Sequence, residues 1–160
     1  MKGSIHRAAR RSWLRGGVAW ALALLAGGGE GRARAASSEP IGQPPRPGPE
    51  SFMARAFALR TAAEAAGDQP YGAVVVLAGR IVGEAPSRTV TASDPTAHAE
   101  IEAIRDAARR LGRRSLAGCV IYASSQPCPM CQAAARWAGI ERYYFGREIS
   151  DGGAPRYPGC

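Results

Sequence analysis

The stretch Asp94-Pro-Thr-Ala-His-Ala-Glu100 opens a predicted helix over residues 97–111, which Gly112 ends. A second stretch, Gln126-Pro-Cys-Pro-Met-Cys131, joins a predicted strand to a predicted helix over residues 129–138. Thirty residues separate the histidine of the first stretch from the first cysteine of the second, enough for one helix, a connection and one strand. We therefore expect both helix starts at one edge of a single sheet.

The sequence on either side of these stretches supplies the other elements of an α/β fold. A helix is predicted from Ser51, a good N-cap residue, to a stop at Gly67. Apolar runs rich in β-branched or aromatic residues predict strands at residues 72–77, 81–82, 119–123 and 142–145. The order αββαβαβ indicates an α/β sandwich, a mixed sheet with helices on its faces. Residues 151–160 are predicted to be loop, so the C-terminal part of the fold is expected to be short.

His98, Cys128 and Cys131 are predicted to bind one metal ion. A Cys-x-x-Cys pair at a helix start offers two thiols one turn apart, near backbone N–H groups that lower their pKa. Two cysteines and one histidine suit tetrahedral zinc with its fourth position open, whereas structural zinc sites close with four protein ligands. The ligand set therefore predicts one catalytic Zn²⁺ per subunit.

Glu100 is predicted to carry protons, because it lies two residues beyond His98 at the same helix start. Zinc lowers the pKa of a bound water towards neutrality. A carboxylate close by can take that proton and pass it to a ring nitrogen, then to a departing amine. The combination His-x-Glu and Pro-Cys-x-x-Cys is typical of zinc deaminases that act on nucleobases. Alone, a Cys-x-x-Cys is more often a disulfide or redox pair, and a single histidine is more often structural.

From Tyr71 to Gly146 the chain resembles the cytidine deaminase superfamily, in particular its guanine deaminase-like and nucleoside deaminase branch. The matching stretches, in order, are Gly72-Ala-Val-Val-Val, Asp94-Pro-Thr-Ala-His-Ala-Glu-Ile, Pro127-Cys-Pro-Met-Cys and Trp137-Ala-Gly-Ile. The resemblance implies a three-layer α/β/α sandwich, hydrolytic deamination of an amino-substituted ring, and a homodimer. It also implies that substrate contacts come from Ser87, Ala97 and Pro127.

Two residues of the chain depart from the family pattern. Ser87 stands where the family commonly has an asparagine that hydrogen-bonds the base, and Gln126 stands where it commonly has glutamate. A hydroxyl reads a different base edge from an amide, so the substrate stays open. The Pro-Cys-Pro-Met-Cys form favours a guanine-like purine as free base or nucleoside. The alternatives are editing of adenosine in tRNA and a zinc-binding module without activity.

The first 35 residues are predicted to be a signal peptide of the twin-arginine type. Arg10-Arg-Ser-Trp-Leu-Arg15 resembles the twin-arginine motif, and an uncharged apolar run over residues 17–27 follows it. That run is shorter than the roughly 20 residues of a membrane span, and Ala33-Arg-Ala35 has the form of a cleavage site. A periplasmic or secreted protein without a membrane span is therefore expected. An uncleaved anchor, or a misassigned start codon and a cytoplasmic protein, are the alternatives.

The basic net charge of the chain lies mostly in this N-terminal segment. Residues 1–35 hold seven of the 21 bases and one of the 13 acids, so the remaining chain carries only +2. A large basic surface for nucleic acid is therefore not expected, and the predicted partner is a small nucleobase or nucleoside. A Pro-rich linker is predicted over residues 36–50, and the zinc-dependent deaminase domain over residues 51–160.

Overall fold

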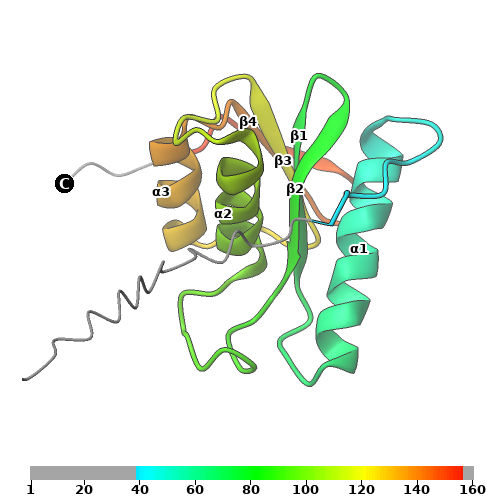
Figure 1. The fold of residues 1–160 in the computed structure, drawn as a ribbon, viewed down its shortest axis with the longest axis vertical. Helices are drawn as coiled ribbons and strands as arrows, with labels where there is room; N and C mark the ends of the chain where they lie inside the picture. The colour runs from blue at the N-terminus through cyan, green and yellow to red at the C-terminus, as the bar shows by residue number, and fades with distance from the viewer. Residues whose placement is uncertain (1–38, 157–160) are drawn as a thin grey trace, which may run out of the picture. The chain divides into compact units, whose positions relative to one another are not determined.

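Residues 39–156 are the part of the chain that this computed structural model describes (Figure 1). The predicted signal peptide lies outside these residues. The helices and strands are α1 (Pro49–Ala65), β1 (Gly72–Leu77), β2 (Arg80–Pro86), α2 (Ala99–Leu111), β3 (Cys119–Ala123), α3 (Pro129–Ala138), β4 (Arg142–Phe145) and β5 (Ser150–Gly153). Between residues 39 and 156, no helix is both long and apolar enough to cross a membrane.

The five strands form one mixed sheet in the order β2-β1-β3-β4-β5. β1 is antiparallel to both β2 and β3, β3 and β4 are parallel, and β5 returns antiparallel to β4. A two-residue turn at Ala78 and Gly79, both with positive φ, joins β1 to β2. The parallel pair needs a crossover connection, and α3 provides it. The start of α3 therefore lies beside the C-terminal end of β3.

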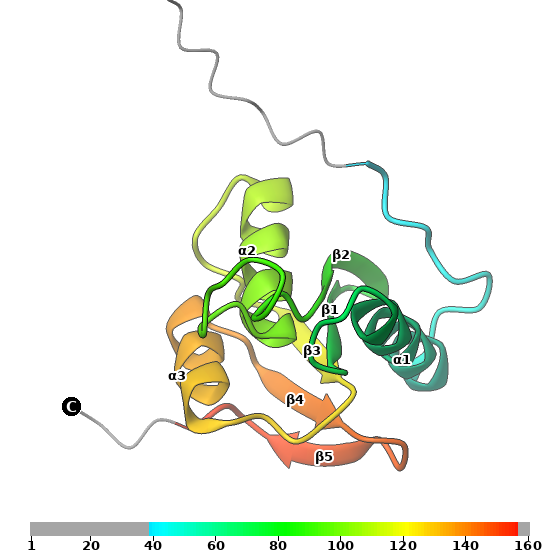
Figure 2. The ribbon, with the colours of Figure 1, turned by 90° about the horizontal axis from the view of Figure 1, so that it is seen from below.

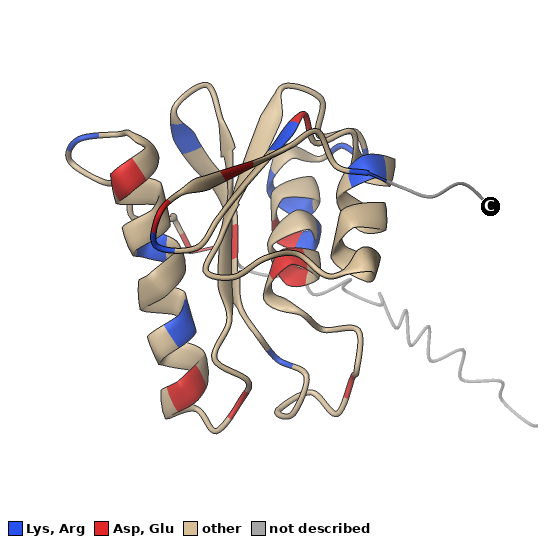
Figure 3. Cartoon of the chain, turned by 180° about the vertical axis from the view of Figure 1, so that it is seen from behind, with Lys and Arg blue, Asp and Glu red and all other residues tan. Residues whose placement is uncertain are grey.

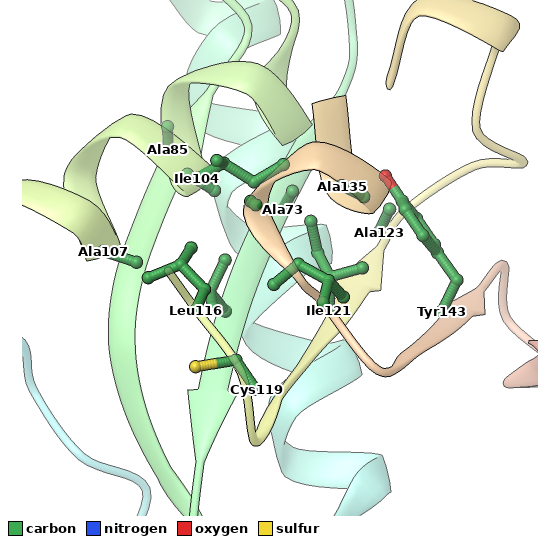
Figure 4. Close-up of a cluster of buried hydrophobic side chains, with 14 of the residues drawn as sticks. Ala73, Ala85, Ile104, Ala107, Leu116, Cys119, Ile121, Ala123, Ala135 and Tyr143 are labelled. Atoms are coloured by element: carbon green, nitrogen blue, oxygen red, sulfur yellow. The ribbon is translucent and has the colours of Figure 1, made fainter. Parts of the chain in front are cut away.

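Helices cover both faces of the sheet, which confirms the predicted three-layer α/β/α sandwich (Figure 2). α2 and α3 lie side by side on one face, and α1 packs on the other. Successive residues of β1 serve the two cores: Ala73 and Val75 face α2 and α3, while Val74 and Val76 face α1. Cys119 is fully buried in the core under α2 and α3 (Figure 4).

The position of α2 is set by close contact with β2. A Cβ atom at Gly83 would lie 2.4 Å from the Ala107 nitrogen and 2.6 Å from the Ala103 carbonyl oxygen, so only glycine fits. Asp106 of α2 adds a polar link, because its Oδ2 accepts the Glu84 N–H at 3.1 Å. The start of α2, which carries the first of the two stretches, is thus fixed relative to the sheet.

α1 begins at Pro49, two residues before the predicted start at Ser51. Proline suits the first helical position, where its missing N–H would have had no helical acceptor. Ser51 lies inside the first turn instead, where its hydroxyl accepts the Gly48 N–H at 3.0 Å and donates to the Gly48 carbonyl at 2.9 Å. The predicted linker therefore ends at Gly48.

The last residues before α1 contact the folded domain. The Gln43 side chain pairs with the main chain of Ile81, accepting its N–H and donating to its carbonyl oxygen, each at 2.9 Å. Ile41 packs against the core on the α1 side, and the Arg110 guanidinium donates to the Glu39 carbonyl at 2.7 Å. Residues 39–48 thus cover part of the edge of β2, where the sequence predicts a linker without a core.

Three further boundaries differ from the predictions. α2 begins at Ala99, not Ala97, because His98 is its N-cap and has extended backbone angles. β2 is longer than the predicted 81–82. Ser150–Gly153 form β5, although the sequence predicts loop from residue 151. The strand is polar and glycine-rich, and its pairing with β4 is supported by an ion pair between Arg142 and Asp151.

Candidate active site

The start of α2 presents His98 and Glu100. The preceding loop is held by Asp94, whose Oδ1 accepts both the N–H and the hydroxyl of Thr96 at 2.7 Å. These bonds lower the pKa of the Asp94 carboxyl. The chain then passes through the extended N-cap His98 (φ −63°, ψ 150°), whose carbonyl accepts the Glu102 N–H at 3.0 Å. Glu100 lies in the first turn and points inward, with only 5% of its surface exposed.

The start of α3 presents the two cysteines. Cys128 is the N-cap (φ −73°, ψ 167°), and Pro129 follows at the first helical position, where its fixed φ suits the turn. Cys131 is one turn further along, fully buried, while Cys128 is half-buried. The positive end of the helix dipole lies at this turn and favours the thiolate forms that bind metals.

The three predicted metal ligands meet between α2 and α3. Cys128 Sγ lies 3.7 Å from His98 Nδ1, Cys131 Sγ lies 3.6 Å from the same nitrogen, and the two sulfurs are 3.5 Å apart. A tetrahedral zinc ion with bonds of about 2.0–2.3 Å needs ligand atoms about 3.3–3.8 Å apart. His98, Cys128 and Cys131 therefore fit a zinc ion, which these three residues would hold.

Glu100 lies directly against this ligand set. Desolvation by burial raises the pKa of its carboxyl, although its own backbone N–H, the Cys131 thiol and the charge of His98 act in the opposite direction. Burial and the charge of Glu100 together raise the pKa of the Cys131 thiol. A divalent cation between the ligands reverses this second effect, because it stabilises thiolate. Glu100 is thus a carboxyl that binds a proton more readily than an exposed glutamate does.

A pocket of about 340 Å³ opens onto the ligand set. This volume is at the lower end of the range for small-molecule sites, about 300–1,000 Å³. The pocket is lined by Gln69, Tyr71, His98, Glu100, Ser125, Gln126 and Cys128. Its wall therefore consists of neutral amides, hydroxyls and an aromatic ring, with one carboxyl and two metal ligands at one side.

The predicted site residues fall into two groups. His98, Glu100, Cys128 and Cys131 come together as predicted, and the first three of them line the pocket. The three predicted substrate contacts, Ser87, Ala97 and Pro127, are all buried and lie outside the pocket lining. Their contact with a substrate stays a prediction.

Three residues of the pocket wall were missed by sequence reasoning. Gln69 and Tyr71 precede β1, and Ser125 follows the C-terminal end of β3. None belongs to a metal-binding or acid–base motif. A signal existed for Ser125, because ligands of open α/β sheets bind beyond the carboxyl ends of strands. Gln69 and Tyr71 had no such signal, since only the fold brings the segment between α1 and β1 beside the start of α2.

The arginines of α2 are engaged by acids of the same helix. Arg105 pairs with Glu102, and Arg109 and Arg110 both pair with Asp106. Figure 3 shows both signs of charge on this helix, with acids in its first turn and bases in its last turn. These three arginines therefore form ion pairs within α2 and do not make an unpaired basic surface.

Comparison with known proteins agrees with this site. The family model of the cytidine and deoxycytidylate deaminase zinc-binding region matches residues 48–147. Guanine deaminase of Bacillus subtilis (strain 168) is 42% identical over 103 residues, which are 64% of this chain and 66% of that protein. The tRNA-specific adenosine deaminase of Agrobacterium fabrum (strain C58 / ATCC 33970) is also 42% identical over 103 residues, 64% of this chain and 68% of that protein.

A solved structure extends the likeness to three dimensions. The X-ray structure of guanine deaminase from Bacillus subtilis superposes with a TM-score of 0.59 at 42% identity, covering 61% of this chain and 62% of that chain. The chain spans about two thirds of the length of the relatives it matches. With the zinc ligands assembled inside the matched region, the chain belongs to the family of the cytidine and deoxycytidylate deaminase zinc-binding region.

Proposed function

We propose that this protein is a hydrolytic deaminase that releases ammonia from a nucleobase or nucleoside, with a guanine-like purine as the favoured substrate. It would be a hydrolase acting on cyclic amidines. The observation that carries the proposal is the burial of Glu100 against His98, Cys128 and Cys131 at one side of the pocket. A zinc-binding module without activity has no evident need for a buried, proton-accepting carboxyl at this place.

The chemistry follows from the positions of these groups. A bound zinc ion would supply a water molecule of lowered pKa. Glu100 takes a proton from the attacking water and delivers it to a ring nitrogen of the substrate. A second proton, from the hydroxyl now bound to the ring carbon, moves through the same carboxyl to the exocyclic amino group. The bond between the ring carbon and this exocyclic nitrogen then breaks, so that ammonia leaves and the carbon keeps the oxygen as a carbonyl. The burial of Glu100 beside the ligand set and at the pocket places its carboxyl where a proton must be accepted and returned.

The pocket lining supports a neutral substrate. The residues that line it include Gln69, Tyr71, Ser125 and Gln126 but neither lysine nor arginine. A nucleotide or a tRNA would need cations for its phosphates, whereas amides and hydroxyls suit the edges of a free base. Sequence similarity alone does not distinguish a free base from tRNA as the substrate, because a guanine deaminase and a tRNA-specific adenosine deaminase match at the same identity.

The substrate is tested by ammonia release. Zinc-loaded protein is incubated with guanine, adenine, cytosine and their nucleosides, and in parallel with an anticodon stem-loop that carries adenosine. We expect release from a free purine or its nucleoside, and guanine first among them. Conversion of the stem-loop alone would establish the tRNA alternative, and no release from any substrate by zinc-loaded protein would favour the inactive module.

We propose that the protein is exported as a folded enzyme through its twin-arginine-type N-terminus. The proposal is supported by the motif at residues 10–15 and by a metal site that can be assembled before export. N-terminal sequencing of protein from the periplasmic or secreted fraction is expected to give a start at Ala36. A protein that keeps Met1 and stays in the cytosolic fraction would contradict export.

We propose a homodimer. The proposal is supported by the family resemblance and by Trp137, which is 71% exposed and lies in α3, the helix that also carries Cys131. Light scattering of the zinc-loaded protein is expected to give twice the monomer mass, and Trp137→Lys is expected to halve it. A wild-type mass equal to one chain would contradict the dimer.

A further inference from the structure

Asp68, in the loop between α1 and β1, binds two loops together. Its side chain is 8% exposed and both of its oxygens are used. The donors to Oδ1 are the Gln69 N–H (2.8 Å), the Ser87 hydroxyl (2.8 Å) and the Thr89 hydroxyl (3.2 Å). The donors to Oδ2 are the Val90 N–H (3.1 Å), the Thr91 N–H (2.8 Å) and the Thr91 hydroxyl (2.9 Å).

Each of the two loops that Asp68 joins carries part of the active site. Residues 67–71 contribute Gln69 and Tyr71 to the pocket wall. Residues 87–97 run directly into His98, and the Arg88 N–H donates to the Ala97 carbonyl at 3.0 Å within this segment. A main-chain bond also joins the loops, since the Ser87 N–H donates to the Tyr71 carbonyl at 2.9 Å. The geometry of the wall relative to His98 thus depends on Asp68 and its donors.

The Ser87 hydroxyl is hydrogen-bonded to Asp68. It is 2% exposed, lies outside the pocket lining and donates to Asp68 Oδ1. The hydroxyl is thus directed to the loop between α1 and β1 and not to the pocket. This differs from the direct contact predicted for Ser87 from the sequence.

The carboxylate form of Asp68 is essential to this arrangement. Burial disfavours the charge, but the donated hydrogen bonds outweigh it and hold the pKa of the carboxyl well below its usual range. An asparagine of the same size would turn an N–H₂ group towards donors at one of the two oxygen positions. Buried donors that face each other lose their bonds, so the loops would separate.

We propose that Asp68 is a positioning residue of the substrate pocket, which holds the Gln69–Tyr71 wall against the segment that leads to His98 and thereby sets substrate affinity. The inference rests on the proposed deaminase function. Because the zinc ligands are also held by α2 and α3, the loss of Asp68 affects substrate binding more than the chemical step.

The test compares Asp68→Asn, Ser87→Ala and the double variant with Glu84→Gln as the matched control. Glu84 is a carboxylate that is hydrogen-bonded to Arg55 at 2.7 Å between β2 and α1, so its loss weakens the fold without touching the pocket loops. For each zinc-loaded protein, kcat and KM for the best purine substrate are measured, together with zinc content and amide hydrogen exchange at Val90 and Thr91.

We expect the KM of Asp68→Asn to rise about tenfold, which is the effect of one misplaced hydrogen bond. Its kcat and zinc content should stay near those of the wild type. Exchange at Val90 and Thr91 accelerates in Asp68→Asn and not in Glu84→Gln. The double variant is no worse than Asp68→Asn alone, because Ser87 acts through Asp68. If the effects of the two substitutions on KM add in the double variant, Ser87 acts independently of Asp68, and the result would favour direct contact of Ser87 with the substrate.

An unchanged KM in a destabilised Asp68→Asn protein would overturn the proposal and leave Asp68 a structural brace. If the proposed deaminase function is wrong, the wild-type protein releases no ammonia from any substrate, which is a different result. In that case the exchange rates decide, and equal rates at Val90 and Thr91 in Asp68→Asn and wild type would overturn the linkage of the loops.

Discussion

Replacing Gly83 by alanine tests whether contact with the sheet fixes the helix that carries His98 and Glu100. Gly83 lies in β2 under α2, where an added Cβ would be 2.4 Å from the Ala107 nitrogen, 2.6 Å from the Ala103 carbonyl oxygen and 2.6 Å from the Ala107 Cβ. Two of these atoms belong to the helix backbone, so no side chain can rotate to make room. The helix itself must move away from the sheet.

The expected cost follows from the nature of this contact. An extra methyl group in a well-packed core costs about 1–3 kcal/mol, and a site closed by backbone belongs at the upper end, about 3 kcal/mol. In a domain of this size 1 kcal/mol lowers the unfolding midpoint by about 4 °C, so the drop is on the order of 10 °C. A displaced α2 also moves His98 relative to the cysteines of α3, which weakens zinc binding.

The assay is thermal unfolding of zinc-loaded protein, followed by zinc transfer to a chelator. Gly42→Ala is the control, because a Cβ there meets no atom within 4 Å. We expect Gly42→Ala to match wild type in both measurements and Gly83→Ala to fall in both. A Gly83→Ala protein with the midpoint and zinc transfer of the control would refute the argument that this contact positions the site.

Three further outcomes are expected. The Tyr143 hydroxyl is buried with no hydrogen-bond partner among residues 39–156, so Tyr143→Phe should raise the free energy of unfolding by about 1 kcal/mol in urea titrations without changing zinc content. Asp68 has a depressed pKa in the folded state, so the stability it provides is fully present above the unfolded pKa of about 4 and is lost as the pH falls towards the lower folded pKa. The gap between the urea midpoints of wild type and Asp68→Asn should therefore narrow progressively below about pH 4, and a constant gap would contradict this. Removal of zinc by a chelator should lower the unfolding midpoint of wild type but hardly that of Cys128→Ser, because only the folded ligand set binds the ion.

Local sequence signals predicted the centre of the fold well. The bounds of β3, α3 and β4 agree with the prediction residue for residue, because apolar runs, Pro129 and Gly139 mark them. The predicted starts of α1 and α2 were less accurate. Ser51 and Thr96 are good N-cap residue types, but Gly48 and His98 cap the helices, with Pro49 favouring the earlier start of α1 and the extended His98 delaying α2.

β5 could not be predicted, because nothing in Ser-Asp-Gly-Gly favours a strand by itself. These residues pair because β4 leaves an open edge, and Gly152 allows close approach to Phe145, whose ring would lie 3.2 Å from a Cβ there. Tertiary context decides such a strand.

The candidate site divides in the same way. The sequence predicts that His98, Glu100, Cys128 and Cys131 lie together, because metal ligands and proton carriers are few residue types at restricted spacing, and the structure brings them together. Contact of Ser87 with the substrate is implied by the family resemblance and stays a prediction, whereas the structure directs its hydroxyl to Asp68 by a bond across 19 residues. No local pattern signals that bond, nor the places of Gln69 and Tyr71 in the pocket wall.

The central claim, that Glu100 moves protons beside a zinc ion held by His98, Cys128 and Cys131, is tested most directly by Glu100→Gln. The substitution keeps the size of the side chain and removes its ability to accept a proton. Ammonia release and zinc content are measured for wild type and variant with the best substrate. We predict a loss of about 10³-fold in release with one zinc ion per chain in both proteins. Release by the zinc-loaded variant at the wild-type rate would contradict the account.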